Sequence, residues 1–194
     1  MILAEREEST TRRPCAWRFV VAGGLVAGAF DIVYACAFWG WKAGVPPRRI
    51  FQSVAAGLLG SASFEGGPAT AALGLGLHFF NALAMSVAYF LVAARWPLLR
   101  RRPVLCGAGY GLLLYAVMSY VVMPLSAAGP GSKDPLWIAL SVAVHVLLVG
   151  IPIALITRQY LETLALMEEL IAVPQPGGGS TDEPAPASLV NIPR

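Results

Sequence analysis

The stretch GGLVAGAFDIVYACAFWGW, residues 23–41, is apolar or small at nearly every position, yet it carries Asp31 near its middle. A helix needs about 20 apolar residues to cross a hydrocarbon core about 30 Å thick. Asp31 follows Arg18 by 13 residues and precedes Lys42 by 11, so it lies about 16–20 Å from either end, near the bilayer midplane. The stretch therefore predicts a spanning helix with a carboxyl group where water is scarcest.

Composition predicts the same medium for the rest of the chain. Of 194 residues, 57% are hydrophobic and 13% charged, against about 45–50% and about 25% in soluble domains. In hydrocarbon each backbone amide must bond within its own segment, and the strict alternation of a β-barrel is absent. We therefore predict an all-α integral membrane bundle with a short extra helix. Its four transmembrane helices are expected at about 19–41, 71–94, 104–125 and 136–156.

The basic residues predict the orientation of the bundle. Lysine and arginine near span ends favour the cytoplasmic side. Nine lie on the side of the two termini, and four (Lys42, Arg48, Arg49 and Lys133) lie on the other. Both termini are therefore expected in the cytoplasm. The cluster RWPLLRRRP, residues 95–103, is interpreted as a topology anchor touching anionic lipid heads, in preference to a specific lipid or nucleic-acid site.

The segments outside the spans have distinct compositions. Residues 47–60 predict a helix too short to span, either interfacial or re-entrant. In this helix and the outer loop after it, four residues are candidate site residues: Gln52, Glu65, Gly66 and Gly67. Residues 1–18 are expected to be a cytoplasmic segment, 157–172 a cytoplasmic amphipathic extension of the fourth helix, and 173–194 a disordered tail.

Helical spacing puts Asp31 on a packing face. Gly24 and Gly28 form a GxxxG pair on the same side, which allows a second helix to approach closely. Gly107 and Gly111 are expected to pack helices in the same way, because neither follows a strand as a nucleotide-binding loop would. An acidic residue at the midplane costs about 2.5–3.5 kcal/mol, so Asp31 should face protein or a wet cavity.

Other polar residues of the spans are expected near the depth of Asp31. This polar intramembrane cluster comprises Asp31, His78, Asn81, Ser119 and His145. One interpretation makes it a set of interhelical hydrogen bonds, at roughly 0.6 kcal/mol each. The other makes it a titrating path for a proton or solute. A zinc site is less favoured, because no paired spacing such as HxxxH occurs, and no metal or other cofactor is predicted.

Several quoted segments together resemble a known family. GLVAGAFDIVYA (24–35), QSVAAGLLG (52–60), FEGGPATAALGLGLHFF (64–80), MSYVVMPLS (118–126) and VGIPIAL (149–155) resemble small bacterial four-span inner-membrane proteins of the YagU type. The resemblance implies the bacterial inner membrane, a part in acid tolerance, and no reaction. The positions it marks are Asp31, Gln52, Gly60, Gly66, Gly67, His78 and Pro124.

Three functional hypotheses follow from these patterns. The first is a non-enzymatic envelope scaffold or modulator. The second is a proton-coupled carrier or pore subunit that uses Asp31, His78 and His145. The third is an intramembrane enzyme, least favoured because no nucleophile and base are paired by the sequence. The expected partners are the lipid bilayer and a second copy or another membrane protein, with no nucleic acid.

Overall fold

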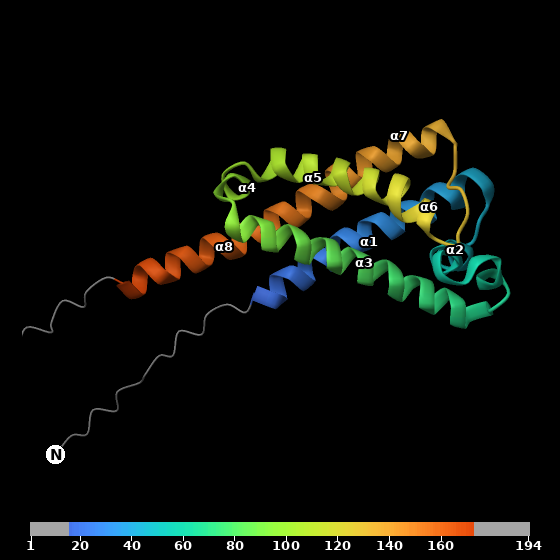
Figure 1. Ribbon diagram of the computed structural model, residues 1–194, viewed down its shortest axis with the longest axis horizontal. Coiled ribbons are helices and arrows are strands. Elements are labelled where there is room, and N and C mark those ends of the chain that lie inside the picture. Colours follow the sequence, from blue (N-terminus) through green and yellow to red (C-terminus); the bar gives the residue numbers. More distant parts are fainter. Residues whose placement is uncertain (1–15, 173–194) are drawn as a thin grey trace, which may run out of the picture.

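A computed structural model describes residues 16–172 of the chain, with side chains described as far as Glu169. Figure 1 shows a bundle of long helices, and the described residues contain no strand. Four of its helices are long and apolar enough to cross a membrane: Ala16–Ala43, Gly67–Arg95, Pro103–Leu125 and Pro135–Glu169. The predicted all-α bundle of four transmembrane helices is confirmed, and the chain is a multi-pass membrane protein.

Some of the long helices are built from several consecutive segments. The helix Pro103–Leu125 contains α5, a π-helical turn η2 and α6, and the last long helix contains α7, a second π-helical turn η3 and α8. The elements in chain order are α1 (Ala16–Ala43), α2 (Pro47–Leu59), the 3₁₀ turn η1 (Gly60–Phe64), α3 (Gly67–Arg95), α4 (Pro97–Arg101), α5 (Pro103–Val117), η2 (Met118–Val122), α6 (Met123–Leu125), α7 (Pro135–Val144), η3 (His145–Gly150) and α8 (Ile151–Ala172).

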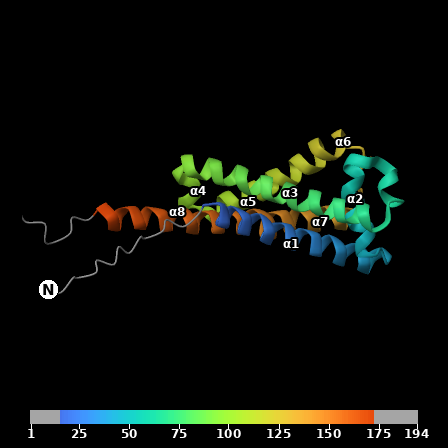
Figure 2. The same cartoon turned by 90° about the horizontal axis from the view of Figure 1, so that it is seen from below.

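The two ends of the bundle differ. The start of α1, the short α4 and the end of α8 lie at one end, while α2 lies across the other (Figures 1 and 2). Proline occupies the first turn of α2, where its missing N–H costs no helical bond. The predicted tail, 173–194, and residues 1–15 of the predicted N-terminal segment lie outside the described residues.

Glycines bring α1 and α3 into close contact. A Cβ added to Gly24 would lie 2.8 Å from Leu83 Cδ2, and one added to Gly28 would lie 3.0 Å from Phe79. Both glycines are buried, whereas Val33, on another side of α1, is 64% exposed. Side-chain hydroxyls add to the contact, because Ser86 of α3 donates a 2.8 Å bond to the carbonyl of Val20.

A second set of glycines joins α5 to the last long helix. A Cβ on Gly111 would overlap the carbonyl of His145, and one on Gly150 would overlap that of Gly107. Gly107 itself lies against Ala154. Such close backbone approach provides the dispersion contacts that hold helices together in lipid. It also fixes η3 directly against α5.

The crossing helix α2 is held from two sides. Gly74 of α3 packs against the backbone of Phe51 and Ala55. From the other side, the N–H of Ala127, which follows α6, donates a 3.0 Å bond to the carbonyl of Gly57. Thus α2 joins α3 to the chain that follows α6, at the end of the bundle away from the two described chain ends.

Replacing Gly74 by alanine should loosen α2. The new methyl group would overlap the carbonyl of Phe51, and a backbone atom cannot move aside as a flexible side chain can. We expect a loss of about 1–3 kcal/mol in the free energy of unfolding, measured by denaturation of the detergent-solubilised protein. Gly76→Ala is the matched control, because nothing lies within 4 Å of its added Cβ. Equal effects of the two changes would contradict this packing.

Candidate functional site

Asp31 lies near the middle of α1 and faces η3. Its Oδ1 is 3.9 Å from Nδ1 of His145, the first residue of that π-helical turn. The Asp31 side chain is 28% exposed and that of His145 is 16% exposed. The distance exceeds that of a direct hydrogen bond. The carboxyl group therefore lies near His145, and both side chains remain partly exposed.

His145 is oriented by its own helix. Its Nδ1 lies 2.9 Å from the carbonyl oxygen of Ser141, and a carbonyl can only accept, so Nδ1 carries the proton. In the neutral imidazole the other nitrogen, Nε2, is then an acceptor. The ring also meets Tyr115 of α5 edge to face, with centroids 5.6 Å apart. His145 thus has a fixed tautomer and retains one nitrogen able to take up a proton.

His78 binds the backbone of α1 instead of the Asp31 carboxyl group. Its Nε2 donates to the carbonyl of Gly28, 2.8 Å away, which fixes the proton on that nitrogen. Gly28 lies one turn before Asp31, so His78 joins α3 to α1 at nearly the same depth. This bond joins α1 to α3, and the side chain that faces the Asp31 carboxyl group is that of His145.

The remaining members of the predicted cluster lie on other elements. Asn81 is half-buried on α3, one turn beyond His78, and Ser119 is half-buried in η2. The closest side-chain pair recorded within the cluster is Asp31 with His145. Among the described residues, no group of three or more histidine, cysteine, aspartate or glutamate side chains forms a metal-binding set.

The two π-helical turns have a common cause in the sequence. Pro124 follows η2 and Pro152 follows η3, and in each case the residue just before the proline donates its N–H five residues back. These donors are Met123, to Met118, and Ile151, to Val146. Proline has no N–H and crowds the carbonyl four residues earlier, so a widened turn accommodates it. These π-helical turns were not predicted from the sequence, although a proline within a helical run is the signal that could have indicated them.

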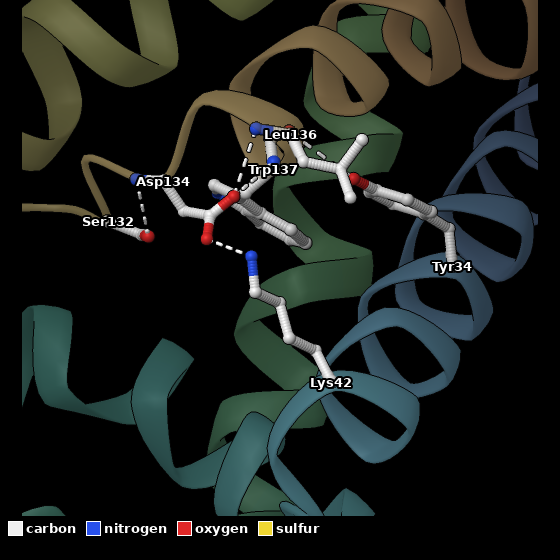
Figure 3. Close-up of polar contacts among 6 residues, drawn as sticks. All are labelled: Tyr34, Lys42, Ser132, Asp134, Leu136 and Trp137. Carbon is white, nitrogen blue, oxygen red and sulfur yellow. Dashed lines mark hydrogen bonds and ion pairs between the residues drawn. The ribbon is translucent and has the colours of Figure 1, made fainter.

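A polar contact at the end of the bundle near α2 aligns α7 with α1. Asp134 caps α7: its Oδ1 accepts from the backbone N–H groups of Leu136 and Trp137, at 2.9 and 3.0 Å. Its Oδ2 accepts from Lys42 at the end of α1 (Figure 3). The same carboxylate thus satisfies the first turn of one helix and pairs with the last turn of another. From the sequence, Lys42 indicated orientation alone, and Asp134 had no predicted role.

Tyr34 extends this contact toward Asp31. Its ring stacks on Trp137 with centroids 5.2 Å apart, and its hydroxyl lies 3.2 Å from Ser141 Oγ. Tyr34 lies one turn beyond Asp31 on α1, and Ser141 lies one turn before His145. Figure 3 shows Tyr34 and Trp137 beside the Lys42–Asp134 pair. These contacts join α1 to α7 and so help set the register in which Asp31 meets His145.

Of the four residues singled out in the predicted outer segment, Gln52 lies on α2 and Gly67 begins α3, whereas Glu65 and Gly66 lie between η1 and α3. Gln52 is buried on α2, with 1% exposure, and its Nε2 donates to the carbonyl of Gly67 (3.0 Å) and to Thr70 Oγ1 (3.2 Å). Thr70 in turn donates to the carbonyl of Ser63. Gly67 begins α3 with φ +60°, which suits glycine. Gln52 and Thr70 therefore join α2, η1 and α3 through hydrogen bonds.

Two buried side-chain atoms near these bonds have no hydrogen-bond partner among the described residues: Gln52 Oε1 and Ser63 Oγ. A buried amide oxygen or hydroxyl usually finds a water or a protein group. Glu65 and Gly66 lie between η1 and α3, and the Glu65 N–H donates to the carbonyl of Ala62. The hydrogen bonds of Gln52 and Thr70 hold neighbouring backbone segments together, so their role is structural.

Comparison of the chain with protein-family models, with curated proteins and with solved structures finds no match in any of the three. The function must therefore be argued from the site.

The Asp134 contact predicts a pH-dependent stability. Hydrogen bonds from Lys42 and from the Trp137 and Leu136 N–H groups hold the pKa of Asp134 below its ordinary value. A lowered pKa in the folded state stabilises the protein above the ordinary pKa, and this contribution is lost as pH falls through the lowered one. Asp134→Asn should thus lower Tm at pH 7 and approach wild type in acid. Asp134→Ala should cost more at pH 7, because it removes the cap as well.

The control for this series is Lys133→Gln, an exposed neighbour that removes one charge from the same loop. It should leave Tm within the error of the scan. A Tm difference between wild type and Asp134→Asn that persists unchanged in acid would contradict the assigned pairing.

Proposed function

We propose that this chain is a non-enzymatic component of the bacterial inner membrane, a scaffold or modulator of the envelope that works by assembling with a second copy or another membrane protein. The observation that carries the proposal is the state of Asp31. It lies mid-span, 28% exposed, and 3.9 Å from the His145 ring. Because an acid in lipid is costly, that exposed surface favours contact with a partner helix.

The other polar groups support a structural use of the spans. Ser86, His78 and Tyr110 each bind a backbone carbonyl of a neighbouring helix, at 2.8 Å in every case. Such bonds crosslink helices and do not by themselves make a path. The bundle is thus internally fixed, and Asp31 is the acid that its own contacts leave incompletely satisfied.

A second candidate is a proton-coupled carrier or pore subunit, favoured by the Asp31–His145 pair. The nitrogen of His145 nearest to Asp31 is the protonated Nδ1, and Nε2 is an acceptor in the neutral ring, so the imidazole can pass its Nδ1 proton to the carboxylate as Nε2 accepts another. The pair also borders η3, and π-helical turns within helices are frequent at functional sites.

The two candidates separate on Asp31→Asn and Asp31→Leu. The oligomeric state would be measured by light scattering on the solubilised protein. Proton flux would be measured in proteoliposomes loaded with a pH-sensitive dye under an imposed potential. Interhelical polar contacts contribute about 0.6 kcal/mol on average and at most about 1.7, so association should weaken about threefold to nearly twentyfold. Phe30→Leu is the control, because Phe30 is an exposed apolar neighbour.

Assembly requires that both Asp31 variants shift the protein toward smaller species, and that wild type and variants show the same background flux. A wild-type flux that Asp31→Asn abolishes, with the oligomeric state unchanged, would overturn assembly in favour of the carrier. If neither quantity changes, Asp31 serves neither role and both candidates fail.

A further inference from the structure

At the end of the bundle opposite α2, a groove lies between α4 and the extension of α8. The residues lining it are Pro97, Arg100, Arg101, Arg158, Leu161, Glu162 and Ala165. Three of them are arginines contributed by two separate elements, and three are apolar. The groove thus combines a concentration of positive charge with an apolar floor.

The neighbouring side chains place the groove at a membrane boundary. Trp96, just before α4, is 65% exposed, and Leu98 within α4 is 59% exposed. Exposed tryptophan is typical of the interface between acyl chains and headgroups. The groove also lies where α3 ends at Arg95 and α5 begins at Pro103, so the chain turns there between two spans. Its apolar floor therefore adjoins the acyl region.

The charges of the groove are only partly compensated. Arg158 Nε donates a 2.7 Å bond to Glu162 Oε1, one turn along α8. Arg100 and Arg101 form no ion pair with an acidic side chain among the described residues. A guanidinium group has five N–H donors arranged to grip phosphate oxygens, so Arg158 also retains donors after binding Glu162. The groove carries a net charge suited to a phosphate.

We propose that this groove binds the headgroup of an anionic phospholipid, with the phosphate on Arg100 and Arg101 and the upper acyl carbons over Leu161 and Ala165. The positive charge of the groove indicates an anionic ligand. The apolar lining residues beside the exposed Trp96 indicate that this anion belongs to a lipid. This assigns the arginine cluster a defined ligand, beyond the orientation role predicted from its sequence. The proposal is independent of any role of Asp31.

The test measures lipid retention by the full-length protein in native mass spectrometry, with phosphatidylglycerol and phosphatidylcholine as probes. Wild type should retain phosphatidylglycerol in preference to phosphatidylcholine. Arg100→Gln with Arg101→Gln should weaken phosphatidylglycerol retention by about tenfold or more. The matched control is Arg95→Gln with Arg102→Gln, which removes the same charge from the same turn at residues outside the groove lining. It should retain lipid nearly as wild type does.

Glu162→Gln supplies a test in the opposite direction. It removes the only acidic side chain among the described residues that line the groove and frees Arg158, so phosphatidylglycerol retention should rise above wild type. Unfolding cannot produce that gain.

Several outcomes would overturn the proposal. Equal losses in the two double variants would show general surface attraction. Displacement of the lipid by millimolar inorganic phosphate would make the site one for free phosphate. Unchanged retention in the Arg100/Arg101 variant, or none of the predicted gain in Glu162→Gln, would place the lipid elsewhere.

Discussion

The structure depends on one constraint: within a bilayer, backbone polar groups cannot exchange their hydrogen bonds with water. Helices must therefore satisfy themselves, and they attract one another mainly through close packing and occasional polar contacts. Buried glycines of α1, α3, α5 and η3 provide the first, because they let backbone or side-chain atoms of a neighbouring helix approach closely. His78, Ser86 and Tyr110 provide the second by donating to carbonyl oxygens of adjacent helices.

The same constraint explains how two prolines can lie within spanning helices. Each removes one N–H, and the helix responds by widening a turn, so that the preceding residue bonds five positions back. The cost is kept small because Gly111 lies directly against the widened turn η3 and leaves it room. One consequence reaches the site: η3 begins at His145, so the irregular turn adjoins the residue that faces Asp31.

Much of this fold follows from sequence, because long apolar runs leave a chain in lipid few alternatives. The four helices could be predicted from length and hydropathy. The partners of individual polar groups could not, since they depend on helix rotation and crossing. His78 binds a carbonyl instead of Asp31, and Gln52, within the short helix expected at 47–60, binds the carbonyl of Gly67, a partner that its position in the sequence did not indicate. Tyr34 is uncharged and Asp134 lies outside the predicted spans, so neither was expected to have a role. Their contacts nevertheless align α1 with α7.

Asp31 differs from these residues in what the fold gains from it. An acid near the midplane costs about 2.5–3.5 kcal/mol, whereas a typical interhelical hydrogen bond returns about 0.6 kcal/mol. Gly24, Gly28 and Ala27 already pack α1 against α3, and the Lys42–Asp134 pair already ties it to α7. A neutral side chain at position 31 would therefore give a bundle at least as stable. Packing does not account for the carboxyl group, so its explanation lies in what Asp31 and His145 do with the surface they leave exposed.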